Sequence, residues 1–204
     1  MNKEEKAKHL EEIDELFRKI ITIHSTFAME SDLIEYIYNW LIEEKICEQS
    51  EILKDKKIGI LIQKQVEVSK NSSLKNGVMF CGHLDSLHLP SKEDLKNTIF
   101  EREESKLHFK NIKENEEIGL DDKTGVITIL KLLKDLKNEN KFKEIELEEV
   151  FKKVEEPKET NLKTINLFVY FSICEEIGQK GIIFFPLEKI VSKIEFDKKK
   201  KKKF

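Results

Sequence analysis

Gly119-Leu120-Asp121-Asp122-Lys123-Thr124-Gly125 leads into a run of apolar residues at helical spacing, and the rest of the chain is organised around this stretch. The apolar positions are Val126, Ile127, Ile129, Leu130, Leu132, Leu133 and Leu136. Asp122 is placed to cap this helix, because a side-chain oxygen there can accept from the free N–H groups of the first turn. Two adjacent carboxylates raise each other's pKa unless a cation or the helix N-terminus offsets them. The stretch therefore predicts either a helix cap with an acidic neighbour or part of a charged site.

Length and composition favour one domain with a substantial core. The chain has 204 residues, of which 38% are charged, and a net charge of −3. This balance argues against a dedicated nucleic-acid binder, which normally presents a basic face. The three cysteines form no Cys-x-x-Cys pair, so neither a disulfide framework nor a zinc knuckle is indicated. With no secretory signal and no apolar run of membrane-spanning length, we expect a cytoplasmic protein without membrane or nucleic-acid partners.

Helical and strand patterns alternate along the chain. Apolar spacing predicts an amphipathic helix over residues 10–21 and a second helix that Ser31 can cap. Alternation predicts a strand with one exposed face at 58–68, and a short apolar run predicts a buried strand at 77–81. Residues 165–173 are apolar on both faces, as a central strand should be. Strands alternating with helices predict an α/β protein.

Charge-dense segments interrupt this pattern. Residues 91–117 are expected to form a surface loop with a short strand near Leu107, and 138–163 a solvated insertion. A further short strand is expected at 194–196. Six lysines then precede the C-terminal phenylalanine, and such a self-repelling tail should be disordered over 198–204. The expected organisation is one domain over 1–197 followed by this tail.

Acidic and histidine side chains follow two of the predicted strands. His83 and Asp85 come after the short apolar strand, and Glu175 and Glu176 come after the central strand. In open α/β sheets, ligands bind in the crevice outside the carboxyl ends of the strands. An imidazole with several carboxylates suits zinc, with manganese or cobalt as alternatives. These residues and Asp121 therefore predict one metal site at that edge.

Three motifs in this order resemble those of the co-catalytic dizinc exopeptidases, a family that includes peptidase T, carboxypeptidase G and the aminoacylases. The motifs are His83-Leu84-Asp85, Asp121-Asp122-Lys123-x-Gly125 and Glu175-Glu176-Ile177-Gly178, and the similarity runs from about Leu10 to Asp197. The resemblance implies a zinc-exopeptidase-like (phosphorylase/hydrolase-like) fold with three helix–sheet–helix layers and a mixed, mostly parallel sheet. It also implies a metal-dependent hydrolase that cleaves small peptides or N-acyl amino acids with water activated by two zinc ions.

The resemblance assigns metal ligands residue by residue. His83 would bind the first metal and Glu176 the second, and Asp121 would bridge both, since its carboxylate has two oxygens. The family's pattern places a further ligand of the first metal at Asp197. On local sequence alone, Asp197 is explained equally well as an acid at the head of the lysine tail.

The resemblance also assigns two catalytic positions. Asp85 would hydrogen-bond the imidazole of His83 and fix its orientation. Glu175 would remain unligated as the general base, taking a proton from the metal-bound water and passing it to the leaving amine. In relatives the peptide bond that corresponds to Asp121–Asp122 would be cis.

The sequence departs from the family's pattern after Asp197. The family's last ligand is a histidine near the end of a much longer chain, and neither that histidine nor the inserted lid domain has a counterpart here. We therefore expect a truncated catalytic domain with an incomplete second metal position, whose exposed sheet edges favour homo-oligomers. The alternative is a catalytically incomplete fragment that acts as a metal-binding or partner-binding module.

Overall fold

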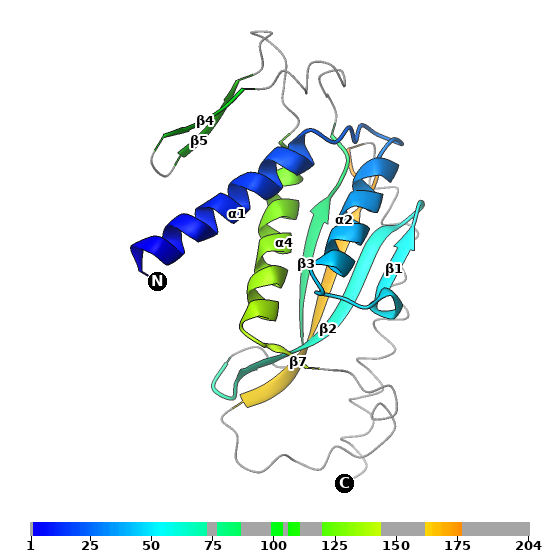
Figure 1. Cartoon of the computed structure of the whole chain (residues 1–204). Coiled ribbons are helices and arrows are strands. Elements are labelled where there is room, and N and C mark those ends of the chain that lie inside the picture. Colours follow the sequence, from blue (N-terminus) through cyan, green and yellow to red (C-terminus); the bar gives the residue numbers. More distant parts are fainter. Residues whose placement is uncertain are drawn as a thin grey trace.

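The computed structural model describes residues 2–72, 77–86, 99–103, 106–110, 120–143 and 162–176 (Figure 1). The helices of these ranges are α1 (Lys3–Ile21), α2 (Ser31–Glu43) and α4 (Lys123–Asn138), with a short 3₁₀ turn at Gln49–Glu51. The strands are β1 (Ile52–Asp55), β2 (Gly59–Ser69), β3 (Gly77–His83), β4 (Ile99–Glu103), β5 (Lys106–Lys110), β6 (Phe142–Lys143) and β7 (Leu162–Ser172). The predicted mixture of helices and strands in one α/β fold is confirmed.

The main sheet has the strand order β1-β2-β7-β3, with β6 also pairing with β2. The long strands β2 and β7 are antiparallel over their whole length, from Gly59 opposite Ser172 to Ser69 opposite Leu162. Strand β3 runs parallel to β7, with His83 opposite Ser172. The sheet is mixed, as expected, but β3–β7 is the one parallel pair among its described strands. A mostly parallel sheet is therefore not seen in the described part of the chain.

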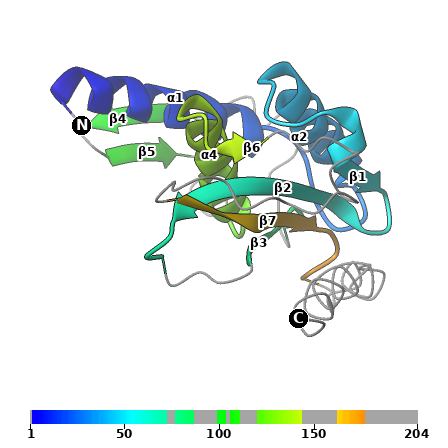
Figure 2. The same ribbon diagram turned by 90° about the horizontal axis from the view of Figure 1, so that it is seen from below.

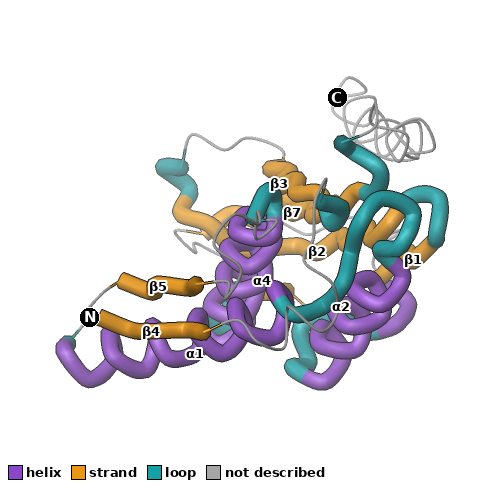
Figure 3. Tube along the Cα trace, turned by 90° about the horizontal axis from the view of Figure 1, so that it is seen from above, coloured by secondary structure: helices purple, strands orange, loops and turns teal. Residues whose placement is uncertain are grey.

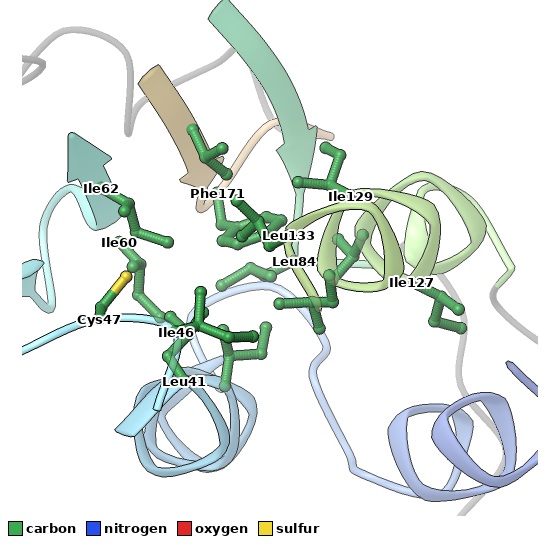
Figure 4. Close-up of a cluster of buried hydrophobic side chains, with 14 of the residues drawn as sticks. Leu41, Ile46, Cys47, Ile60, Ile62, Leu84, Ile127, Ile129, Leu133 and Phe171 are labelled. Carbon is green, nitrogen blue, oxygen red and sulfur yellow. The ribbon is translucent and has the colours of Figure 1, made fainter. Parts of the chain in front are cut away.

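The described helices all lie on one face of this sheet (Figure 2). Helix α4 packs on β3, α1 packs on α4, and α2 lies against β1 and β2; the view from above shows the same arrangement (Figure 3). The helix-facing side chains of the strands alternate with outward-facing ones, as strand geometry requires. The core between the layers includes Leu41, Ile60, Ile62, Leu133 and Phe171 (Figure 4).

The opposite face of the sheet carries a second, smaller apolar cluster. Leu61, Phe168 and Tyr170 are buried there, and the Tyr170 hydroxyl donates to the Ile58 carbonyl at 2.9 Å. Phe168 and Val169 are neighbours on β7 and both are buried, so the prediction of a central strand that is apolar on both faces is confirmed. No helix of the described ranges covers this second face.

The structure corrects two local predictions. The strand predicted to be buried at 77–81 is half exposed: β7 alone pairs with it among the described strands, and Met79 is 39% exposed on the side away from α4. Helix α2 is not capped by Ser31, which is its first helical residue. Its N-cap position is occupied by Glu30, whose side chain makes no capping hydrogen bond.

Several sequence predictions concern residues at the ends of the described ranges or outside them. The strand near Leu107 is confirmed as β5, which forms a separate hairpin with β4. In the segment predicted as an insertion, β6 and the start of β7 are described and 144–161 are not. Asp197, the strand at 194–196 and the lysine tail lie outside the described residues. Among the described helices, none has the length and apolar character needed to cross a membrane.

Candidate metal centre

The candidate site forms where the carboxyl ends of β3 and β7 meet. Because these two strands are parallel and in register at His83 and Ser172, the residues after them emerge at the same edge of the sheet. His83, Glu175 and Glu176 each offer a ligand atom within 4.8 Å of the others. The start of α4 lies beside them and brings Asp121 to the same place, with its Oδ1 3.3 Å from Nε2 of His83.

The imidazole of His83 is held on both sides. Its Nδ1 donates to the main-chain oxygen of Asp85 at 2.9 Å, while the nearest Asp85 carboxylate oxygen lies 3.7 Å away. Burial lowers the pKa of His83, but the hydrogen bonds and charge of Asp85 and the charge of Asp122 outweigh it and raise this pKa to about 9. With this pKa the ring carries a proton on Nε2 at neutral pH, and a metal ion bound at Nε2 would have to displace it.

Asp85 has a second contact that the sequence did not reveal. Its side chain is fully buried, and its two carboxylate oxygens accept hydrogen bonds from the backbone N–H groups of Glu175 and Glu176, both at 3.0 Å. Burial raises the pKa of Asp85, but the nearby His83 imidazole and these two backbone hydrogen bonds prevail and lower it. Asp85 is therefore an ionised acceptor that joins the loop after β3 to the turn after β7.

Asp121 and Asp122 lie in different surroundings, and the expected helix cap is seen at Asp122. The peptide bond between them is cis, as the resemblance implied. Asp122 is the N-cap of α4 and accepts from the Gly125 N–H at 3.1 Å. Asp121 is exposed to 85% at its side chain and faces His83. The cap and the candidate metal ligand are thus neighbouring residues in different surroundings.

Glycines leave the space that Asp122 occupies. A Cβ on Gly125 would lie 2.6 Å from Asp122 Oδ2, and one on Gly82 would lie 3.1 Å from the same atom. Both are closer than ordinary van der Waals contact. Any larger residue at Gly125 would therefore compete directly with the cap, and one at Gly82 would press on it from the β3 side.

Glu176 lies in a strongly acidic environment. Burial raises its pKa; the charge of His83 lowers it, while Glu175, Asp121 and Asp85 raise it further. Like charges this close favour the protonated form of one member unless a cation offsets them. A divalent ion among these side chains would reverse the shift.

The donor set fits a divalent cation. One imidazole nitrogen and several carboxylate oxygens are the ligands that zinc and related metals accept, with bonds of about 2.0–2.2 Å. Of the six predicted site residues, five are described, and the structure brings all five together: His83, Asp85, Asp121, Glu175 and Glu176. Asp197 lies outside the described residues, and its role stays a prediction.

Two buried residues beside the site were not singled out from the sequence. Lys123 is fully buried and donates to the Ile23 carbonyl at 3.0 Å, and burial lowers its pKa to about 8. Glu30 is only 4% exposed and accepts from Cys174 N–H at 3.1 Å. Lys123 belongs to the motif Asp121-Asp122-Lys123-x-Gly125, which could have drawn attention to it, whereas nothing in the local sequence distinguishes Glu30 from other acidic residues.

Comparisons with known proteins bear on the fold alone. No model of a protein family matches the sequence, and no curated protein does. Aminopeptidase PepT from Bacillus cereus is similar in structure, with a TM-score of 0.56 and 13% identity over 88% of this chain. The chain spans 40% of the length of that aminopeptidase. Aminoacylhistidine dipeptidase from Vibrio alginolyticus gives a TM-score of 0.48, with 20% identity over 83% of this chain and 29% of its own.

Proposed function

We propose that this chain is part of a metal-dependent hydrolase of the exopeptidase type, acting on peptide or amide bonds of small peptides or N-acyl amino acids. The observation that carries the proposal is the convergence of His83, Asp121, Glu175 and Glu176 at one sheet edge. The likeness in fold to an aminopeptidase supports the same class.

The side chains divide into metal ligands and a proton carrier. His83, Asp121 and Glu176 would hold two divalent metals, zinc before cobalt or manganese, with Asp197 as a further ligand. Bound metals of this kind lower the pKa of a coordinated water and polarise the scissile carbonyl. Glu175 would accept the proton of that water and deliver it to the departing amine nitrogen. Asp85 accepts from the backbone N–H groups of Glu175 and Glu176, and the side chains of these two glutamates each have an oxygen within 4.8 Å of a His83 ring nitrogen.

Metal analysis of the purified protein tests the proposal directly. After equilibration with zinc, cobalt or manganese and removal of free metal, elemental analysis should find stoichiometric metal in the wild type and in Glu175→Gln. Turnover of a panel of tripeptides and N-acyl amino acids should fall about 10²- to 10⁴-fold in the Glu175→Gln variant, because the general base is lost. Only trace metal in the wild type would refute the proposal.

A second candidate is a metal-binding module without turnover. The observation behind it is the group His83, Glu175 and Glu176, whose ligand atoms could hold a metal ion whether or not a substrate is turned over. Stoichiometric metal together with no hydrolysis of any substrate in the panel would select this alternative. Hydrolysis that disappears in Glu175→Gln would exclude it.

A further inference from the structure

The turn after β7 carries three consecutive backbone N–H groups that all donate to buried carboxylates. Cys174 N–H donates to Glu30 Oε1 at 3.1 Å, and the N–H groups of Glu175 and Glu176 donate to the two oxygens of Asp85 at 3.0 Å. Glu30 precedes α2 and Asp85 follows β3, so two distant segments hold one turn. The turn in question is the one that presents both candidate site glutamates.

Glu30 is directed at this turn rather than at its own helix. It is the N-cap residue of α2, where a side chain usually accepts from the first turn, yet its carboxylate makes no such bond. Its main-chain oxygen begins the helix instead, accepting from Ile34 N–H at 2.9 Å. The positive end of the α2 dipole still favours a negative charge at this position, where the residue is only 4% exposed.

Cys174 needs such a partner because of its backbone conformation. Its φ of 53° lies in the left-handed region, which non-glycine residues seldom occupy. Glu30 Oε1 accepts both the Cys174 N–H and, at 3.5 Å, the Cys174 thiol, so one oxygen holds the residue at two points. This left-handed residue redirects the chain immediately before Glu175.

We infer that Glu30 is a positioning residue of the candidate metal centre: its carboxylate, paired with that of Asp85, fixes the turn 174–176 so that Glu175 and Glu176 face His83. The part of this inference that concerns metal rests on the proposed function. The part that concerns the turn does not, because it is a property of the metal-free chain.

Hydrogen exchange of the metal-free protein tests the turn by itself. The variants are Glu30→Ala, which removes the acceptor, and Glu30→Gln, which keeps one acceptor oxygen without the charge. Glu43→Gln, an exposed glutamate at the other end of α2, is the control. The amides of Cys174, Glu175 and Glu176 should exchange about 10-fold faster or more in Glu30→Ala, less so in Glu30→Gln, and unchanged in the control.

The amides in the middle of β7 separate positioning from general stability. Those of Val169 and Tyr170 should keep their wild-type exchange rates in all variants. A uniform rise across β7 and the turn, with a lower unfolding temperature, would mean that Glu30 only stabilises the fold and would overturn the inference. Unchanged exchange at the turn in Glu30→Ala would overturn it as well.

Cobalt titration then tests the consequence for the site. Loss of a residue that supports the ligands typically weakens metal affinity about 10- to 100-fold, and Glu30→Ala should show this while Glu43→Gln should not. Equal cobalt affinity in wild type and Glu30→Ala would overturn the inference and leave the proposed function standing. If the wild type binds none of zinc, cobalt or manganese, the proposed function fails, and the exchange measurement alone decides the role of Glu30.

Discussion

At the scale of single residues, the packing around Asp122 reverses an ordinary expectation for glycine. Gly125 is the third residue of α4, and a helical glycine is normally about 1 kcal/mol less favourable than alanine. Here the space that an alanine Cβ would occupy is taken by the capping carboxylate, 2.6 Å from Oδ2. The cap and the glycine are therefore a coupled pair, and the space they share matters more than helix propensity.

The Gly125→Ala variant should consequently be less stable than the wild type. We expect a loss of about 1–2 kcal/mol in the free energy of unfolding by urea, comparable to removing an N-cap. In an Asp122→Ala background the clash is gone, so the same Gly125→Ala change should stabilise the protein by about 0.5–1 kcal/mol. A Gly125→Ala effect of equal sign in both backgrounds would contradict this explanation.

At the scale of elements, the sequence predicts best what is decided locally. Helix α4 was predicted from its apolar periodicity and the adjacent cap, and strand β7 from a continuous apolar run, because these signals lie within or beside each segment. The closeness of His83 to Glu175 and Glu176 was predicted because these residues come directly after two strands, whereas the metal role of Asp121 was assigned through the resemblance. The partial exposure of β3 was not predicted, since the burial of a strand depends on which other strands and helices flank it. Nor was the contact of Glu30 with Cys174, which joins positions 144 residues apart without any local pattern.

Lys123 links two elements, and because it is buried we expect its contribution to stability to depend on pH. Its ammonium joins the N-terminus of α4 to the Ile23 carbonyl just beyond α1. Its folded pKa of about 8 lies below the unfolded value of 10.5, so the unfolded chain binds more protons between these values. Stability contributed by this group should therefore rise as pH increases from about 8 to 10.5, by roughly 2–3 kcal/mol.

Comparison with Lys123→Met isolates this effect. The difference in unfolding free energy between wild type and variant should shift in favour of the wild type across that pH window. Lys134→Met, which removes a partly exposed ion pair with Glu44, should leave the window unchanged. Parallel wild-type and Lys123→Met curves between pH 8 and 10.5 would show that the buried amine does not titrate as described.

At the scale of the whole molecule, the protonation of His83 contributes to global stability. The folded pKa of His83 is about 9 against an ordinary 6.5, so the folded metal-free chain binds a proton that the unfolded chain releases. That contribution is complete below about pH 6.5 and is lost as pH rises through about 9, with a total on the order of 2–3 kcal/mol. The stability contributed by His83 thus falls with rising pH, whereas that contributed by Lys123 rises, and the change at His83 begins at a lower pH.

Urea unfolding of the metal-free protein at pH 6.5 and 8.5 should therefore show wild-type stability falling more than that of a His83→Asn variant.

A bound metal would change this pH dependence of stability, because it would take the place of the His83 proton. At a free concentration 100 times its dissociation constant, a metal that binds only the folded state adds about 2.7 kcal/mol. At a fixed cobalt concentration, the gain should be larger at pH 8.5 than at 6.5, where the proton competes. A metal-induced gain that is independent of pH, or that persists in His83→Asn, would place the ion somewhere other than at this imidazole.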